Sequence, residues 1–161
     1  MSSTYTIADE PRPSTISHLC VNPVWPLFGV MFVGPWFSWT WFLVNAFAMG
    51  SPNSRKEILT AIGGLVGATV IVFLAAVLVT NMNIEEGGFD PRPYIYLVIT
   101  VWQLGVSYYL YMLQTETFGL YEYFGGKVNN GILPLIAGAL LGRRLISPVF
   151  EAIPLLPLII G

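Results

Sequence analysis

Residues 58–80, ILTAIGGLVGATVIVFLAAVLVT, form an uninterrupted stretch without a single charged side chain. An α-helix rises about 1.5 Å per residue, so this stretch is long enough to cross a hydrocarbon core about 30 Å thick. Gly63 and Gly67 lie four residues apart, a spacing that lets another helix approach to backbone contact, and Gly138 and Gly142 repeat it further on. We predict a membrane-spanning helix here, with the four glycines as helix-packing positions within the chain or between chains.

The composition of the whole chain agrees with a membrane protein. Of its 161 residues, 55% are hydrophobic and 10% are charged, whereas soluble domains carry about 25% charged residues. The net charge of -2 excludes the basic surface that nucleic-acid binding needs. One Cys and one His exclude an internal disulfide framework, a multi-thiolate metal site and a haem held by two histidines. We expect no metal, no cofactor and no nucleic-acid partner.

Three further stretches are predicted to cross the membrane, at about 24–49, 94–114 and 131–150. The first has no charge over its length, and Pro35 is expected to kink it. The second has tyrosines near both ends, which is typical of the aromatic belts at membrane surfaces. The predicted fold is therefore an all-α, polytopic four-helix transmembrane bundle. It would occupy residues 23–161 as one domain, after a polar tail at 1–22.

The last of these spans is the least regular, because Arg143 and Arg144 interrupt its apolar pattern. An arginine at the centre of a membrane helix costs about 2.5–3.5 kcal/mol on the insertion scale. A re-entrant segment over 131–141 would avoid that cost and give three spans plus a re-entrant C-terminal segment. In either arrangement the two arginines are candidates for interfacial contact with lipid headgroups.

The polar loop at 50–57 indicates an orientation for the chain. Arg55 and Lys56 place this loop on the cytoplasmic side, because short cytoplasmic loops carry the excess of basic residues. The amino terminus would then lie on the opposite side of the membrane. Ser54 and Glu57 have the spacing of a capping box, in which both side chains bond to the first turn of the helix.

The first three predicted spans contain no Asp, Glu, Lys, Arg or His. Ionisable groups inside the bilayer mark pumps, proton-coupled transporters and intramembrane enzymes, so the pattern argues against these classes. We expect no catalytic residues. The leading hypothesis is a non-catalytic multi-pass subunit, a scaffold or accessory chain of a homo- or hetero-oligomeric complex. Its partners would be membrane lipids and other membrane chains or copies of itself, in a bacterial inner membrane or an equivalent one.

Two alternative functions remain open. In the first, the chain forms a small homo-oligomeric channel for a neutral solute, lined by the uncharged polar side chains of Asn45, Thr69, Gln103 and Ser107. In the second, it is an accessory protein that binds a pigment or a quinone. The aromatic segment 36–41, which contains three tryptophans, would then be the platform for the ring.

Overall fold

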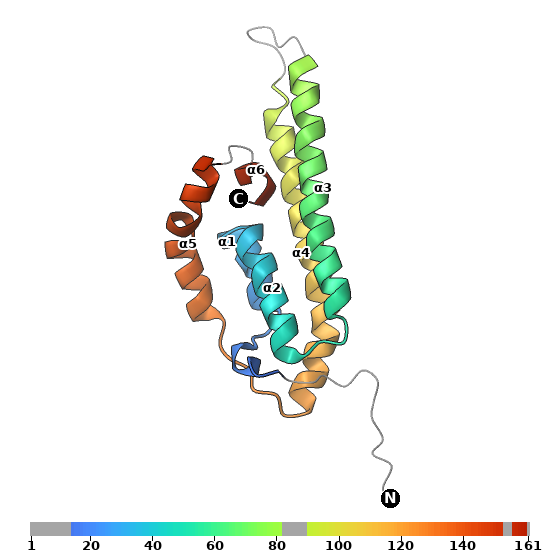
Figure 1. Cartoon of the computed structure of the whole chain (residues 1–161), viewed down its shortest axis with the longest axis vertical. Helices are drawn as coiled ribbons and strands as arrows, with labels where there is room; N and C mark the ends of the chain where they lie inside the picture. The colour runs from blue at the N-terminus through green and yellow to red at the C-terminus, as the bar shows by residue number, and fades with distance from the viewer. Residues whose placement is uncertain (1–13, 82–89, 153–155, 161) are drawn as a thin grey trace, which may run out of the picture.

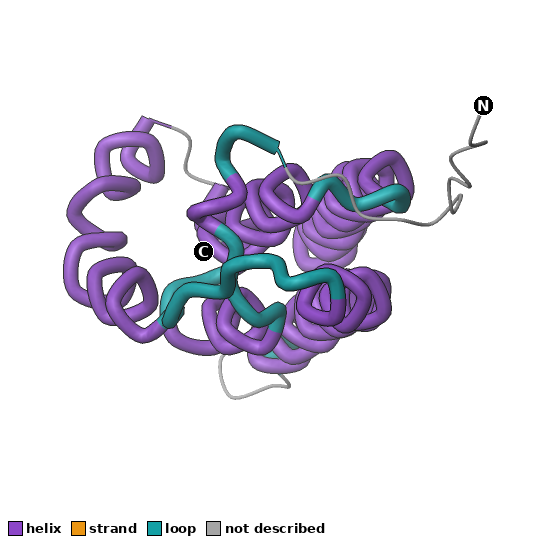
Figure 2. Tube along the Cα trace, turned by 90° about the horizontal axis from the view of Figure 1, so that it is seen from below, coloured by secondary structure: helices purple, strands orange, loops and turns teal. Residues whose placement is uncertain are grey.

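The computed structural model describes residues 14–81, 90–152 and 156–160 (Figure 1). Seen along the bundle, this part of the chain consists of helices and loops without a strand (Figure 2). The all-α prediction is therefore confirmed for these residues. The elements are the short 3-10 helix η1 (Ser17–Leu19) and the α-helices α1 (Val24–Phe32), α2 (Pro35–Met49), α3 (Ser54–Asn81), α4 (Arg92–Tyr123), α5 (Ile132–Ala152) and α6 (Leu156–Ile160).

The two longest helices, α3 and α4, lie side by side and run in opposite directions (Figure 1). They contain the predicted spans 58–80 and 94–114, and both are long and apolar enough to cross a membrane. Most of their large apolar side chains face outward and are exposed in the isolated chain, which is the arrangement a lipid environment stabilises. Helix α5 provides a third candidate span if its two halves, which meet at a 46° bend, are counted together.

The prediction of a continuous span over 24–49 is wrong. These residues form two short helices, α1 and α2, which fold back on each other as a helical hairpin. The Ser38 hydroxyl donates to the Pro26 carbonyl oxygen at 2.6 Å, and the Cα of Gly29 lies beside Phe37. At 1.5 Å per residue the two helices are about 14 Å and 22 Å long. Neither can cross a core about 30 Å thick.

The reversal occurs at Gly34 and Pro35. Gly34 has φ 119° and ψ 167°, a backbone conformation that residues with a Cβ rarely adopt. Pro35 then occupies the first turn of α2, where its missing N–H leaves no helical hydrogen bond unmade. A proline within a continuous helix would only have kinked it, whereas this Gly-Pro pair ends one helix and begins the next.

The hairpin brings the described amino-terminal residues to the same end of the bundle as the loop between α2 and α3. The Val21 N–H donates to Asn45 Oδ1 near the end of α2 at 2.9 Å, and Cys20 packs against Met49. The same segment meets the loop after α4, where the Asn129 N–H donates to the Cys20 carbonyl at 2.8 Å. The prediction that this segment and the first loop lie on opposite sides of the membrane is therefore wrong for residues 14–23.

Helix α5 lies along the outside of the hairpin and runs parallel to α1 (Figure 1). Gly138 lies against the ring of Phe37, and Gly142 against Val33 and Trp36. The described residues thus form two helices that are long and apolar enough to cross a membrane, a helical hairpin and a bent fifth helix. The predicted bundle of four crossings is not confirmed. The chain reverses direction between α1 and α2, and the 46° bend of α5 fits both a broken span and the predicted re-entrant segment.

Candidate functional site

The interior of the bundle contains a group of buried polar side chains at the end where α2 meets α3. Glu57, in the first turn of α3, is fully buried. The Ser51 hydroxyl donates to Glu57 Oε1 at 2.6 Å, and Gln114 Nε2 of α4 donates to Glu57 Oε2. The same Gln114 nitrogen donates to the Phe42 carbonyl oxygen at 2.6 Å. Both carboxylate oxygens are therefore held by neutral donors from different parts of the chain.

Asn45 extends this network to the start of the hairpin. Its Nδ2 donates to Gln114 Oε1 at 3.0 Å, while its Oδ1 accepts the Val21 N–H at 2.9 Å. Four hydrogen-bonded side chains, Asn45, Ser51, Glu57 and Gln114, thus connect α2, the following loop, α3, α4 and the segment before α1. We call these four residues the interior network. Within the described residues no basic side chain lies within 4.0 Å of Glu57.

The sequence did not identify Glu57 as an interior residue, because its spacing from Ser54 suggested a helix cap. In the structure its carboxylate is directed into the bundle and bonds to Ser51 and Gln114. A signal for this was present, since Glu57 begins the row of small residues that forms the buried face of α3. That row continues through Ala61, Gly64, Ala68, Val72 and Ala75, and its spacing of three and four is that of one helix face.

A second set of polar contacts lies deeper in the bundle. The Trp39 indole N–H donates to Ser107 Oγ at 2.9 Å, and that hydroxyl donates to the Gln103 carbonyl at 2.8 Å. Gln103 Nε2 donates to the Ile159 carbonyl of α6 at 3.0 Å. Gln103 and Ser107 therefore both bond to groups of neighbouring helices. Both side chains serve to hold α2, α4 and α6 together.

The glycines of α3 have different surroundings. Gly63 is exposed, and a Cβ added there would have nothing within 4 Å. Its neighbour Gly64 is buried, and its carbonyl accepts the Trp102 indole N–H at 2.9 Å. Gly67 lies directly against the Trp102 ring of α4. Inside the chain, α4 therefore contacts α3 at Gly64 and Gly67, and a packing role of Gly63 between chains stays a prediction.

The predicted aromatic platform is divided by the fold. Trp39 and Trp41 are buried in the core, whereas Trp36 is half-buried. Trp36 lines a cleft of about 530 Å³ between the tip of the hairpin and α5, with Gly34 and Phe150 on its other walls. The three rings do not form one face toward this cleft, and pigment or quinone binding stays a prediction.

The residues considered for a channel are also separated. Asn45 belongs to the interior network, and Gln103 and Ser107 are bonded to other core groups. Thr69 is exposed on α3, where its hydroxyl donates to the Leu65 carbonyl of its own helix at 2.8 Å. A solute path through one chain would need these four side chains to face a common cavity. Their hydrogen bonds instead direct them to different parts of the bundle.

The two arginines both belong to α5. Arg144 is exposed, and the side chain of Arg143 lies outside the described residues. Contact of this pair with lipid headgroups stays a prediction. As for metal binding, three or more His, Cys, Asp or Glu side chains do not come together anywhere in the described part of the chain.

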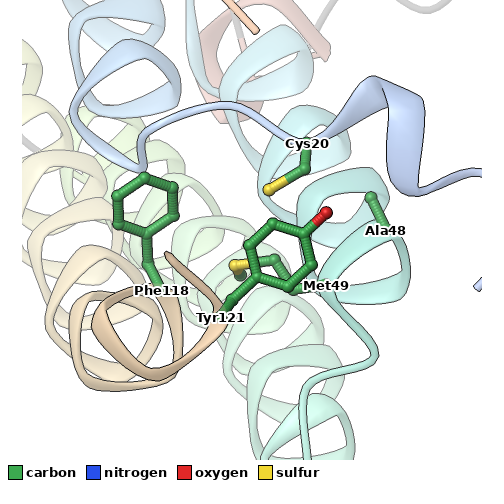
Figure 3. Packing of buried hydrophobic residues seen from close by; sticks show 5 residues of the cluster. All are labelled: Cys20, Ala48, Met49, Phe118 and Tyr121. Atoms are coloured by element: carbon green, nitrogen blue, oxygen red, sulfur yellow. The ribbon is translucent and has the colours of Figure 1, made fainter. Parts of the chain in front are cut away.

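Cys20 is fully buried in a small cluster beside the interior network. Figure 3 shows its sulfur close to the Tyr121 ring, with Ala48, Met49 and Phe118 completing the cluster. Burial raises the pKa of the Cys20 thiol from 9.0 to about 11, and a hydrogen bond with the Tyr121 hydroxyl opposes this rise. The thiol is therefore protonated at neutral pH and packs as a small apolar side chain.

This pKa shift predicts a pH dependence of stability. The unfolded chain loses its thiol proton near pH 9, whereas the folded chain keeps it until about pH 11. The stabilisation is therefore fully present below pH 9 and is lost as the pH rises through 11. A shift of this size corresponds to about 3 kcal/mol. Between pH 8.5 and pH 11, the free energy of unfolding measured with denaturant should fall more for the wild type than for Cys20→Ala. Equal falls would contradict the raised pKa of the Cys20 thiol.

No family model, curated protein or solved structure matches this chain. Its function is therefore inferred from its own geometry.

Proposed function

We propose that this protein is a non-catalytic multi-pass membrane subunit that assembles with other membrane-embedded chains, either copies of itself or different subunits. The observation that carries the proposal is an apolar groove of about 460 Å³ between α3 and α4. Trp102 and Gly105 of α4 and Ile71 of α3 line it. A Cβ added at Gly105 would have nothing within 4 Å, so the helix backbone is accessible there.

A membrane helix of a second chain is the occupant that this groove suits best. Helices in lipid associate through close van der Waals packing, because hydrocarbon tails are as apolar as leucine and supply no hydrophobic driving force. Glycines let two helix backbones approach closely and increase that packing. Gly63, with open space in front of its backbone, offers a second such position on α3.

The bundle interior supports the same interpretation. The polar side chains that could serve as catalytic groups form hydrogen bonds between helices instead. Examples are the bonds between Glu57 and Gln114 and between Trp39 and Ser107. Hydrogen bonds of this kind hold the relative positions of helices and make the outer surface a defined shape. A fixed apolar surface with an accessible groove is what a scaffold or accessory subunit needs.

The test is the state of association after mild extraction into nanodiscs. We expect native mass spectrometry to find more than one copy, or a copurifying membrane chain. Gly105→Leu fills the groove and should lower the associated fraction at least tenfold without changing helicity. Gly119→Leu is the matched control, because Gly119 is also exposed with open space in front of it but lies outside the groove. A wild-type chain that is monomeric and copurifies with no other protein would refute the proposal.

A further inference from the structure

The tip of the α1–α2 hairpin lies level with the apolar middle part of the long helix α3 (Figure 1). Trp36, in the first turn of α2, lines a cleft with Ile62 and Leu65 of α3. One helical turn further from the tip, the Trp39 ring lies against Gly64. The chain therefore ends one helix and begins the next at a depth that hydrocarbon occupies around a membrane-spanning α3.

The carbonyl end of α1 carries backbone acceptors that receive no hydrogen bond. The N–H groups of Val33 and Gly34 both donate to the Gly29 carbonyl. The next residue, Pro35, has no N–H to donate. Among the described residues, no donor reaches the carbonyls of residues 30–33. Four unpaired acceptors are thus gathered at the hairpin tip, as expected at the end of a helix without a capping partner.

The cleft between the hairpin tip and α5, which we call the tip cleft, lies at this end of α1. Residues 30–34 line it, and Ser147 and Phe150 of α5 contribute to its other walls. The tip is not enclosed by protein on all sides, because the side chains of Met31 and Phe32 are 66% and 65% exposed. The volume of the tip cleft is about 530 Å³. At about 30 Å³ per molecule, this is room for roughly ten to twenty waters.

Lipid tails cannot satisfy the carbonyls at the tip. An acyl chain has no hydrogen-bond donor, and an unpaired backbone group in hydrocarbon is strongly unfavourable. Irregular backbone at membrane depth is therefore tolerated only where protein encloses it or where it borders a water-filled cavity. The other wall of the cleft is also partly polar. The Ser147 hydroxyl donates to the Arg144 carbonyl at 3.3 Å, and its oxygen can still accept a hydrogen bond from water.

We propose that the tip cleft is a water-binding site within the membrane, where water donates to the carbonyl end of α1 and to Ser147. The site goes beyond the proposed function, because it concerns the inside of one chain rather than its association. It gives α5 two different environments. Ser147 is half-buried but faces water, whereas Leu145, two residues earlier, is 72% exposed but lies outside the cleft and faces lipid.

Thiol labelling in nanodiscs with a charged methanethiosulfonate tests this assignment. The thiolate is the reacting form, and it exists only where water can solvate its charge. Ser147→Cys should therefore react at least ten times faster than Leu145→Cys, although Leu145 is the more exposed residue in the isolated chain. The wild type serves as the blank, because its Cys20 is buried.

Filling the cleft provides the matched pair of variants. Ala139 lines the tip cleft, so Ala139→Phe combined with Ser147→Cys should slow labelling at least fivefold. Leu140→Phe is the control, because Leu140 is 71% exposed and lies outside the cleft, and it should leave the rate unchanged. If Ser147→Cys loses its helical circular dichroism, Ile146→Cys takes its place, since Ile146 also lines the cleft.

Equal labelling rates at positions 147 and 145 would overturn the proposal. Two slow rates would mean that lipid fills the tip cleft, and two fast rates would mean that this part of α5 lies outside the membrane. An unchanged rate in the filled variant would overturn it as well. A monomeric wild type without partners would refute the proposed function and leave the difference in labelling intact, so the two can fail separately.

Discussion

Replacing Gln114 by leucine is expected to lower the free energy of unfolding by about 3–5 kcal/mol. The amide of Gln114 bonds to Glu57, to the Phe42 carbonyl and to Asn45. Leucine is close to it in size but leaves these three buried groups without that partner, and each buried group left unpaired costs about 1–3 kcal/mol. Denaturant unfolding followed by circular dichroism in mixed micelles measures the change.

Gln103→Leu is the matched control for this prediction. It is the same substitution on the same helix, and Gln103 is also buried, but its side chain makes one hydrogen bond, to the Ile159 carbonyl. We expect a loss of about 1 kcal/mol. If Gln114→Leu costs no more than Gln103→Leu, the interior network does not determine how the helices are held.

A double-mutant cycle would show whether Glu57 and Gln114 act as a pair. Glu57→Leu leaves the Ser51 hydroxyl and the Gln114 amide without their acceptor. The double variant Glu57→Leu/Gln114→Leu leaves fewer buried polar groups unpaired than the two single variants do together. Its loss in the free energy of unfolding should therefore be smaller than the sum of the two single losses. A coupling energy of about 1–3 kcal/mol is expected for groups in one network. Strict additivity would contradict the direct contact.

The long helices α3 and α4 could be predicted from the sequence because length and apolar composition decide a span. The hairpin could not be predicted by the same criterion, since residues 24–49 contain no charge whether they form one helix or two. What decides between the two forms is Gly34, with its positive φ, followed by Pro35. The Gly-Pro pair is a turn signal, but within a long apolar run it is also compatible with a kink.

Individual packing positions are harder to predict than spans. The spacing of small residues shows which of them share a helix face, but in a wholly apolar helix it does not show which face points toward the core. Gly63 and Gly67 have the same spacing as Gly64 and Ala68, and the sequence does not say which pair faces inward. The register is determined by Glu57, whose hydrogen bonds to Ser51 and Gln114 turn the row that contains Gly64 toward the core. A charged residue next to a span suggests the membrane surface, and in the sequence this indication outweighs the row of small residues that continues from Glu57 along one helix face.

The two adjacent glycines of α3 provide the second large predicted effect. Gly64→Leu should lower the free energy of unfolding by at least about 3 kcal/mol, at the upper end of the usual cost of overpacking. A Cβ at this position would lie 2.7 Å from Val106 Cγ1 and 3.1 Å from Trp39 Cη2. The remaining leucine atoms would push α4 away and disturb the hydrogen bond from the Trp102 indole to the Gly64 carbonyl.

Gly63→Leu is the control one residue away, with the same change in volume and in helix propensity. Because a Cβ there has nothing within 4 Å, the substitution meets no steric resistance in the single chain. Leucine also favours a helix over glycine by up to about 1 kcal/mol, so the monomer in detergent should be as stable as the wild type or slightly more so. Unfolding of both variants under the same conditions measures the difference. If Gly63→Leu were the more damaging substitution, α3 would present the opposite register to α4, and Glu57 could not bond to Gln114.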